Sequence, residues 1–471
     1  MSALIWYRQD LRVQDNLAVA HAWQNHECVH AVVAITEVQW QRHDWAPIKR
    51  DLYERRLNAL AAELGALGVI LHTVVCDTDK QLPAALLALA QELHVDALYF
   101  NREYPLNEKR RDNAVAAWFE QHGKAVHKFD DLVVVAPERI QTGSGSYYKK
   151  FTPFYKTWLK VVAEQGVSAP ENLKPKGEPL EPTPITLSGD KRDSSAYGAD
   201  TSDLQQRMQR FIHERVHHYS SARDLPAKPG TSLLSPYLEN GGLGVRTLLR
   251  GLAEQAPDFP FGLGKGADTW LSELAWRDFY QHLMWHVPRL SYGKAFITET
   301  EQFPWQQNDA HFQAWASGKT GFPIVDAGMR QLAAEGWMHN RVRMIVASFF
   351  VKDLQLDWRL GERFFMQNLV DGSFAANNGG WQWSASTGTD AVPYFRVFNP
   401  ERQSAKFDPS GEYIRRWVKE LQQVPVKEIH APHRWLRQYD RSNNYPAPIV
   451  DHSEMREQFI ETFKKVKNGS I

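Results

Sequence analysis

The sequence is poor in the features that mark secreted and membrane proteins. It has only 2 cysteines among 471 residues, Cys28 and Cys76, and each lies in an apolar, strand-like run. Two such cysteines form neither a disulfide framework nor a CxxC metal motif, so we expect both to be reduced and buried. No apolar run approaches the ~20 residues of a membrane span, and no secretory leader pattern opens the chain. These absences predict a cytoplasmic protein that does not enter a membrane.

The sequence also lacks an excess of either charge and the common hydrolase motifs. Its 55 basic residues equal its 55 acidic residues, so any nucleic-acid site has to be a local basic patch. HExxH and GxSxG are absent. "GLGKGA" (262–267) has no buried strand before it, and "SGKTG" (317–321) lacks the first glycine of a P-loop. His213 and His217 have no third ligand nearby, so we expect a solvated helix face and no metal.

Residues 1–130 show a regular alternation of strand-like and helix-like segments. The strand patterns are "ALIWY", "CVHAVVAIT", "VILHTVV", "VDALYF" and "HKFDDLVVVAP", and helical patterns stand between them. Strands that are apolar on both faces indicate a parallel sheet covered by helices on both sides. The first turn reads "RQDLRVQDN" and not GxGxxG. We therefore predict an α/β domain with a Rossmann-like five-stranded parallel sheet that lacks the Gly-rich fingerprint.

The composition changes twice after this domain. Residues 131–200 are rich in proline, glycine and charge, which predicts a long exposed linker between domains. From Thr201 the patterns are mostly helical, so residues 201–471 are predicted to form an all-α domain.

The segment 268–285 is a predicted helix with an apolar stripe at helical spacing. Glu273 and Arg277 lie i,i+4 on another stripe, with Trp276 beside them. Spacing alone favours an ordinary surface ion pair over a carboxylate and an indole presented together at a cavity.

A second helix is predicted over 336–359, with Asn340, Arg343 and Met344 on one face. A buried Asn and a buried Arg need partners, and Asp371 is a candidate partner for Arg343. A flat heteroaromatic ligand with many hydrogen-bonding edges would suit such a pocket.

Two further segments leave their interpretation open. Small hydroxyl residues follow Gly230 in "GTSLLSPYL", which suits either a diphosphate site at a helix start or an ordinary helix cap. Among 17 tryptophans, Trp381 and Trp383 stand one residue apart in "NNGGWQWSAST". A helix would splay these two indoles by roughly 200°, whereas a strand would put them on one face. A pocket for a flat group and a dense core both remain possible.

Several multi-residue motifs together resemble the photolyase/cryptochrome family. They are "WYRQDLRVQDN", "ELAWRDFY", "WMHNRVRM", "KDLQLDWR" and "DGSFAANNGGWQWSASTGTDAVPYFRVFNP", and they run end to end in the family order. The chain most resembles the bacterial class I cyclobutane pyrimidine dimer photolyases. The resemblance implies an all-helical FAD-binding domain after the α/β domain, and a monomer that acts on UV-damaged DNA, single- or double-stranded. It implies repair by electron transfer from excited reduced FAD (FADH−) to a flipped-out dimer, which is a carbon–carbon lyase reaction. The alternative within the family is a blue-light receptor cryptochrome without repair activity.

The resemblance also implies roles for individual residues. The residues that would hold FAD are Tyr219, Thr231, Ser232, Leu234, Ser235, Trp270, Arg277, Asn340, Arg343, Asp371 and Asn377. Those that would act at the dimer are Glu273, Asn340, Trp276 and Met344, with Trp383 as the second wall of an aromatic wedge. Arg223, Arg341 and Arg396 would meet DNA phosphates. Trp381, Trp358 and Trp305 would carry electrons between the flavin and the surface.

A second, light-harvesting chromophore is implied for the α/β domain. His43, Asn107, Glu108 and Lys149 match positions that bind a folate antenna, 5,10-methenyltetrahydrofolate, whereas Ser291 and Tyr292 depart from the folate type. We expect the folate, and a deazaflavin or a flavin stays open. The family often reads Asp-Gly-Asp where this chain has Asp371, Gly372 and Ser373. FAD binding should survive this change, whereas redox tuning near the ring is affected.

Overall fold

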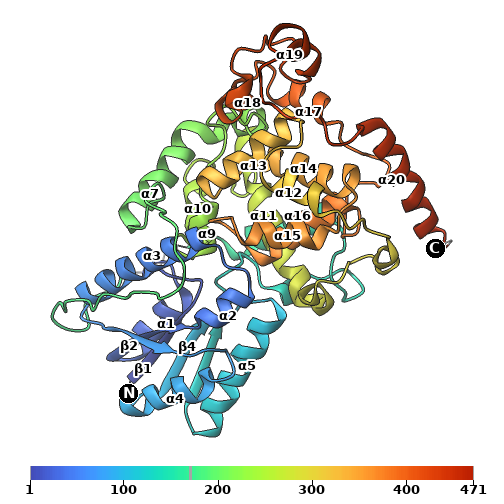
Figure 1. Ribbon diagram of the computed structural model, residues 1–471. Coiled ribbons are helices and arrows are strands. Elements are labelled where there is room, and N and C mark those ends of the chain that lie inside the picture. Colours follow the sequence, from blue (N-terminus) through green and yellow to red (C-terminus); the bar gives the residue numbers. More distant parts are fainter. Residues whose placement is uncertain (1, 169–171, 470–471) are drawn as a thin grey trace. The chain divides into compact units, whose positions relative to one another are not determined.

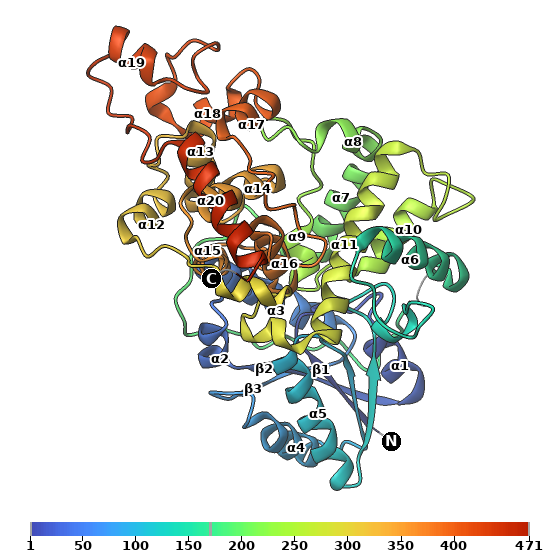
Figure 2. The ribbon, with the colours of Figure 1, turned by 90° about the vertical axis from the view of Figure 1, so that its right-hand side faces the viewer.

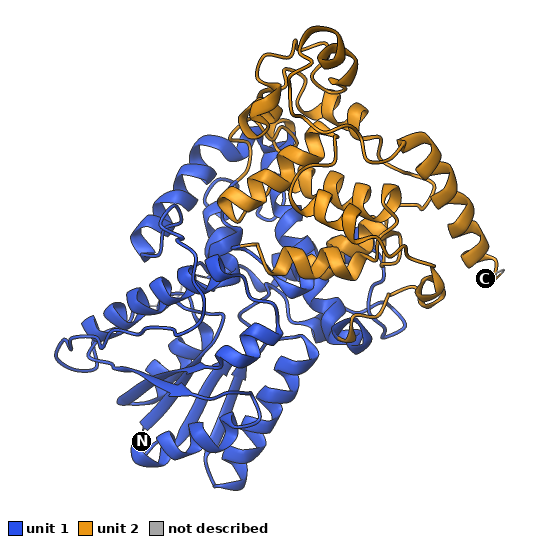
Figure 3. Cartoon of the chain, viewed as in Figure 1, with its two compact units in different colours: residues 1–220, 232–291, 370–375 blue, residues 221–231, 292–369, 376–471 orange. Residues whose placement is uncertain are grey.

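The structure, a computed structural model, describes residues 2–168 and 172–469 and divides into two compact units. Unit 1 comprises residues 1–220, 232–291 and 370–375, and unit 2 comprises residues 221–231, 292–369 and 376–471 (Figure 3). Each unit is described by itself. The boundaries of these units differ from those of the predicted domains, so the domain boundaries at residues 130 and 200 stay a prediction.

Unit 1 contains a five-stranded sheet in which every strand runs parallel to its neighbours, in the order β3-β2-β1-β4-β5 (Figure 1). The strands are β1 (Ser2–Tyr7), β2 (Cys28–Ile35), β3 (Leu71–Val75), β4 (Ala97–Asn101) and β5 (Ala125–Phe129). The predicted parallel sheet is thus confirmed. The chain extends the sheet first to one side of β1 and then to the other, so the strand order switches between β1 and β4. Ligands of open α/β sheets bind outside the carboxyl ends of the strands at such a switch point.

Two apolar layers fix the helices on the sheet. Ala3 and Ile5 of β1 share one core cluster with residues of α1 and α3, whereas Leu4 and Trp6 share another with residues of α4 and α5 (Figures 1 and 2). These helices are α1 (Leu17–Asn25), α3 (Pro47–Ala66), α4 (Leu82–Glu92) and α5 (Leu106–Gln121). Side chains alternate between the two faces because a strand has a period of two. The short α2 (Glu37–Arg42) was missed by the sequence patterns.

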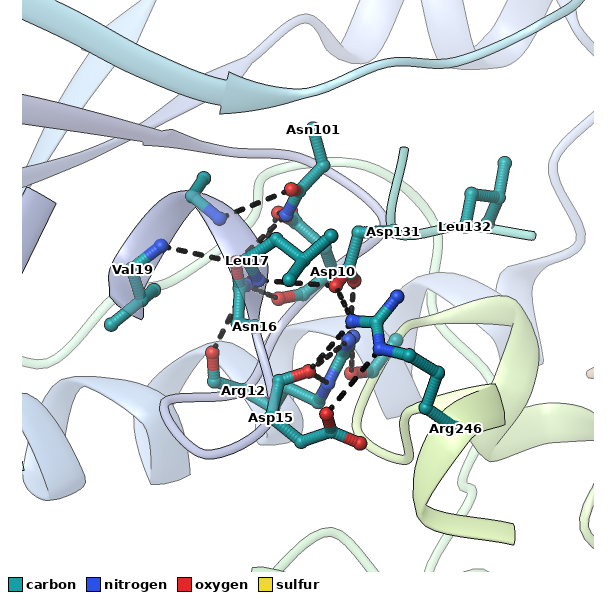
Figure 4. A network of polar contacts seen from close by, with 12 residues as sticks. Asp10, Arg12, Asp15, Asn16, Leu17, Val19, Asn101, Asp131, Leu132 and Arg246 are labelled. Atoms are coloured by element: carbon teal, nitrogen blue, oxygen red, sulfur yellow. Dashed lines mark hydrogen bonds and ion pairs between the residues drawn. The ribbon is translucent and has the colours of Figure 1, made fainter. Parts of the chain in front are cut away.

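Side chains fill the turn that follows β1, where a dinucleotide-binding protein would have glycines (Figure 4). Arg12 and Arg246 both donate to the carboxylate of Asp131, and Arg246 also pairs with Asp15. Burial acts to raise the pKa of Asp131, but the two arginines hold it below its ordinary value. Nearby, Asn101 donates to Asp10 at 2.6 Å. This network explains the missing fingerprint, because the bulky side chains occupy the place that a phosphate group would take.

Two sequence-based predictions about unit 1 were wrong. The segment after residue 130 is not uniformly exposed, since it includes η1 (Pro137–Arg139) and the helix α6 (Phe151–Gln165), whose Phe154 and Trp158 are buried. Further along, the Leu180 amide donates to the Gly65 carbonyl at 2.9 Å, so this part of the segment lies along α3. Cys28 was expected to be buried but is exposed at the start of β2, whereas Cys76 is buried as expected.

From Thr201 the chain is helical, as predicted. The elements up to residue 292 are α7 (Thr201–Arg210), the π-helical η2 (Phe211–Arg215), η3 (Val216–His218), α8 (Tyr219–Ala222), α9 (Ser235–Glu239), α10 (Val245–Ala253), α11 (Lys265–His286) and η4 (Pro288–Tyr292). The predicted apolar stripe of α11 is buried, namely Leu271, Leu274, Ala275, Phe279 and Leu283. Of "GLGKGA", only residues 262–264 form the expected loop, since α11 already begins at Lys265; His213 and His217 are exposed.

The later elements belong mainly to unit 2. They are η5 (Thr298–Gln302), α12 (Asp309–Ala316), α13 (Pro323–Glu335), α14 (Asn340–Ser348), the π-helical η6 (Phe349–Asp353), α15 (Trp358–Met366), α16 (Phe374–Ala385), α17 (Pro400–Phe407), α18 (Glu412–Trp417), η7 (Lys419–Leu421), α19 (His433–Tyr439) and α20 (His452–Lys467). Helix α13 packs against α14, α17 and α18 (Figure 2). Among the described residues, no helix combines the length and apolarity needed to cross a membrane.

The single helix predicted over 336–359 is wrong. Gly336 has a φ of +67° and ends α13 in the left-handed conformation that glycine adopts without strain. Helix α14 begins anew at Asn340, where the His339 side chain caps it, and α15 begins at Trp358 after the π-helical turn. The apolar periodicity continued across these breaks, which is why the sequence suggested one helix.

Candidate functional site

In unit 1 the short helix α9 and the loop 370–375 bring two of the predicted FAD residues together. The Ser235 hydroxyl donates to the Asp371 carboxylate at 2.7 Å, and Asp371 is buried. Leu234, which precedes α9, is also buried. A buried carboxylate held by a hydroxyl offers one fixed acceptor, which suits the hydrogen-bonding edge of a heteroaromatic ring.

The other predicted FAD residues near α9 differ in exposure. Thr231 and Ser232 are half-buried, and the Ser232 hydroxyl accepts from the Leu234 amide at 3.4 Å. Tyr219 and Trp270 are buried and both lie against Phe211, with ring centroids 6.0 and 5.0 Å away. The hydroxyls are therefore partly accessible to a ligand, whereas the two rings pack against Phe211.

Helix α11 carries three residues of the predicted site, and they are not a surface cluster. Arg277 is half-buried and donates to the carbonyl oxygens of Leu132 and Leu238, so the expectation of a simple surface pair with Glu273 is wrong. Glu273 and Trp276 are half-buried. The Trp276 ring stacks on Phe151 with centroids 3.8 Å apart and an interplanar angle of 8°.

Sequence reasoning missed Asp278, the residue after Arg277. Its carboxylate accepts from the Val134 and Val135 amides at 2.8 and 3.2 Å and from the Trp158 indole at 2.9 Å. Burial raises the pKa of Asp278 to about 6, although these hydrogen bonds act to lower it. Since its partners are distant in sequence, spacing could not have revealed this role.

In unit 2, one face of α14 was expected to hold a buried Asn and a buried Arg. The side chains on this face are more exposed than expected. Asn340 is exposed, and Arg343 and Met344 are half-buried, so this part of the prediction was wrong. Arg343 donates to the Met338 carbonyl at 2.7 Å. A polar face outside the apolar core can meet a ligand. The proposed pairing of Arg343 with Asp371 joins residues of different units and stays a prediction.

The arginines predicted to meet phosphates have different surroundings. Arg341 binds Asp224 at 2.9 Å, and its guanidinium lies 4.4 Å from the centre of the Phe407 ring. Arg396 is exposed, and its carbonyl accepts from Lys352 at 3.1 Å. Arg223 is half-buried. Arg396 is thus the most accessible of the three to DNA.

Helix α16 separates its two tryptophans, as a helix has to. Trp381 is 2% exposed, and its ring meets Phe365 edge-on with centroids 5.0 Å apart. Gly361 of α15 is required here, because a Cβ at this position would lie 2.2 Å from the Trp381 ring. Trp383 is half-buried and lies 6.4 Å from the Phe398 ring.

The glycine and the asparagine that precede these indoles have different surroundings. A Cβ at Gly380 would meet no heavy atom of the described residues within 4 Å, so packing inside the protein does not require glycine there. Asn377 donates to the Glu362 carbonyl at 2.9 Å, a contact that ties α16 to α15. The approach of Asn377 to a flavin stays a prediction.

Two of the three tryptophans of the predicted electron path are buried in unit 2, and the third is half-buried. Trp381 and Trp358 are buried in the same aromatic core. Trp305 is half-buried and packs against that core and against a second cluster formed by Phe303, Phe459, Phe463 and Val466. This difference in burial suits a path along which an electron enters from solvent.

Three of the four predicted antenna residues meet in unit 1. The His43 ring nitrogens lie 3.4 Å from the Asn107 amide and 3.7 Å from the Glu108 carboxylate. His43 and Glu108 line a pocket with an empty volume of about 520 Å³, part of it open solvent, and Trp40 and Trp45 line it as well. Burial raises the pKa of Glu108 to about 7. Lys149 is exposed and does not line this pocket.

The chemistry of these donor sets fits an FAD group. Each unit presents polar side chains beside buried aromatic rings, and the hydroxyls before α9 can receive phosphate oxygens. Within residues 2–168 and 172–469, no group of three or more His, Cys, Asp or Glu side chains could hold a metal ion.

A parallel α/β sheet followed by a helical region with these polar and aromatic side chains defines the photolyase/cryptochrome class of flavoproteins. The DNA photolyase model matches residues 3–176, and the model for the FAD binding domain of DNA photolyase matches residues 270–465. The chain belongs to the DNA photolyase family and carries its FAD-binding domain.

Individual relatives agree with this assignment. The deoxyribodipyrimidine photo-lyase of Escherichia coli strain K12 is 43% identical over 99% of both chains. Among solved structures, a bacterial class III photolyase from Agrobacterium tumefaciens has a TM-score of 0.84 and 32% identity, and the match covers 99% of this chain and 98% of that one. An archaeal photolyase from Sulfolobus tokodaii with two FAD molecules has a TM-score of 0.81 and 30% identity, and the match covers 99% of this chain and all of that one, 100%.

Proposed function

We propose that the protein is a deoxyribodipyrimidine photo-lyase that reverses cyclobutane pyrimidine dimers in UV-damaged DNA under light. The observation that carries this proposal is the half-buried state of Trp276 and Trp383, the two residues assigned to the lesion, next to core residues on the same helices. An indole kept out of the core can stack on an extruded base. Relatives that match this chain over nearly their whole length are named deoxyribodipyrimidine photo-lyases, which supports the same reaction.

We propose these residues for holding FAD. Ser235 and Asp371 form a ready hydrogen-bonded pair, Thr231 and Ser232 would receive the diphosphate, and Asn340 would meet the flavin at N5. The further FAD residues would be Tyr219, Leu234, Trp270, Arg277, Arg343 and Asn377. When bound, FAD supplies the light-absorbing electron donor of the reaction.

The chain would also bind the lesion and handle its protons. Extruding a damaged pair costs a few kcal/mol, and stacking between Trp276 and Trp383 returns about 1–3 kcal/mol per base. Glu273 would hydrogen-bond the bases and exchange a proton with them. Arg341 and Arg396 would hold phosphates, which position the DNA without reading its sequence.

The aromatic path would supply electrons from the surface. We propose that Trp305 receives an electron at the surface side and that Trp358 and Trp381 pass it inward. The greater exposure of Trp305 supports its place at the surface side of this path.

For the antenna we propose 5,10-methenyltetrahydrofolate at the pocket of His43, Asn107 and Glu108. The half-buried carboxylate of Glu108 would accept from the amino and ring N–H groups of a pterin. A deazaflavin or a flavin is the alternative, and one structural relative is described with two FAD molecules. We further propose a monomer that acts in the cytoplasm.

A light receptor without repair activity is the competing function, and one experiment separates the two. Purified, reduced protein is incubated with UV-irradiated oligonucleotide, single-stranded and duplex, in blue light or in darkness. We expect the dimer count to fall only in the illuminated samples. Equal dimer counts in light and darkness would reject repair and favour the receptor.

A further inference from the structure

A buried ion pair in unit 1 connects the α/β region to the loop that carries Asp371. The Lys49 ammonium of α3 donates to the Glu239 carboxylate of α9 and to the Gly372 carbonyl, each at 2.7 Å. Both side chains are buried, at 5% and 10% exposed. The ammonium also lies 4.4 Å from the centre of the Trp45 ring. Spacing did not reveal the pair, because 190 residues separate its members.

The same two helices hold three consecutive residues of the loop. Ser235, at the start of α9, binds the Asp371 side chain. Lys49 binds the carbonyl of Gly372, and Glu239, at the end of α9, receives a hydrogen bond from Ser373. Each contact fixes a different residue, so the backbone that carries Asp371 has little freedom.

A buried pair of charges is costly to build and is strongly destabilising to break, since removal of one partner leaves the other charge unpaired. Burial raises the pKa of Glu239, and Lys49, Arg277 and the Ser373 hydroxyl oppose this rise. The short contact to the ammonium favours the ionised carboxylate. The pair therefore places one negative and one positive charge directly behind the loop.

We propose that Lys49 and Glu239 are positioning residues that hold the Asp371–Ser373 loop and set the electrostatic field at the flavin. This inference rests on the proposed function, in which Asp371 faces FAD. Glu239 then supplies an acidic group beside Ser373, where the family often has a second aspartate.

The test uses the FAD-loaded protein and two opposite changes of charge. Glu239→Gln keeps the shape of the side chain and one acceptor oxygen but removes a negative charge, so the flavin midpoint potential should rise. Lys49→Met removes the positive charge, so the potential should fall. The double variant should return close to the wild-type potential. If the substitutions acted only through lost packing, the flavin midpoint potential would shift in the same direction in both single variants.

Affinity for FAD gives a second readout on the same proteins. Lys49→Met releases the Gly372 carbonyl, so we expect FAD to bind about ten-fold more weakly, as for the loss of a charge-assisted hydrogen bond. Lys191→Met is the matched control, because Lys191 pairs with Glu54 of the same helix α3 at 2.8 Å, away from the loop. The control should bind FAD like the wild type.

The outcomes separate this inference from the proposed function. Wild-type protein that fails to bind FAD or to reverse dimers rejects the proposed function. If the wild type does both, potentials in Glu239→Gln and Lys49→Met that are unchanged or shift alike overturn the role of the pair. If Lys49→Met fails to fold, Glu239→Gln alone tests the role of the pair, because the flavin midpoint potential has to rise in this variant.

Discussion

The pocket of the α/β region and the aromatic path of the helical region are built in contrasting ways. Around His43 the polar side chains already bind one another. The amides of Gln39 and Asn107 lie 2.8 and 3.4 Å from the Nε2 atom of His43, and the Glu108 carboxylate lies 3.7 Å from its Nδ1 atom. In unit 2, by contrast, Asn340 is exposed and Trp383 and Trp305 are half-buried beside core residues. In the first site the polar side chains bind one another, whereas in the second several polar and aromatic groups lie outside the core.

The difference teaches which changes should affect function and which should affect stability. A residue of the helical path can be altered with little loss of packing when it is half-buried. A residue of a buried charge network cannot, because its partner loses a hydrogen bond or an opposite charge. The following substitutions test this contrast from the largest expected effect to the smallest.

The largest effect is expected at the surface end of the aromatic path. Trp305→Phe should abolish photoreduction of the oxidised flavin, because phenylalanine is much harder to oxidise than tryptophan. Repair by chemically reduced protein should be retained. The rate of flavin bleaching in blue light with an external reductant measures photoreduction, and dimer counts measure repair.

Trp435→Phe is the matched control, since Trp435 is also half-buried in the helical region and lies outside the proposed path. It should photoreduce at the wild-type rate. Normal photoreduction in Trp305→Phe would remove this residue from the path.

The contact between the first residue of helix α20 and the buried Asp353 predicts the next largest effect, on stability. His452 binds Asp353 at 2.5 Å, and burial raises the pKa of Asp353 to about 6. His452→Ala should lower the free energy of unfolding by about 3 kcal/mol, the scale expected for breaking a buried pair. His452 opposes the raised pKa, so the variant should lose more stability as the pH rises through this value. Chemical denaturation at several pH values checks both expectations.

Lys465→Ala on the same helix is the control for this change. Lys465 pairs with Glu461 at 2.8 Å, but both side chains are exposed, so no measurable change in stability is expected. Equal stability of the two variants would show that the Asp353 contact does not hold α20.

A smaller effect is expected at the proposed lesion wedge. Trp276→Ala should weaken binding of dimer-containing oligonucleotide by about 1–3 kcal/mol, the value of one aromatic–base stack. Binding of undamaged oligonucleotide should change less. Trp118→Ala, which removes a 40% exposed indole from α5, should leave both affinities unchanged. An unaltered dimer affinity in Trp276→Ala would make this ring a packing partner of Phe151 only.

The smallest effect is expected at the antenna pocket, as a change in pH dependence. The pKa of Glu108 is about 7 in the folded protein and about 4.5 as its ordinary value. The folded state therefore binds the proton more tightly, and this contribution to stability is lost as the pH rises towards 7 and above. Glu108→Gln should remove this loss, whereas Glu120→Gln on the exposed side of α5 should keep it. Parallel stability curves for wild type and Glu108→Gln would contradict the assignment.

Much of the fold could be predicted because its signals are local. Apolar strands and the apolar stripe of α11 follow from a period of two or of about 3.6 residues. The break at Gly336 could not be predicted, because the apolar pattern continues across it and only the backbone shows the left-handed turn. The path of the chain after residue 172 along α3 depends on contacts between distant segments, which composition does not report.

The candidate site shows the same division. The motifs that resemble the family marked Trp381, Trp383 and Asp371, whereas Lys49 and Glu239 carry no local signal and meet only through the fold. The exposure of Asn340 was also unpredictable, since helical spacing gives the face but not what covers it. Motifs thus indicated candidate ligand-binding groups, and the structure was needed to find the groups that hold them.

The most direct test of the account uses a synthetic oligonucleotide that contains a single thymine dimer. Reduced protein is illuminated with blue light, and the product is analysed by chromatography and mass spectrometry. Photo-lyase activity predicts an intact strand of unchanged mass that now elutes with the undamaged oligonucleotide, and no change in darkness. A dimer that persists after illumination, or a cut strand or released base, would contradict the account.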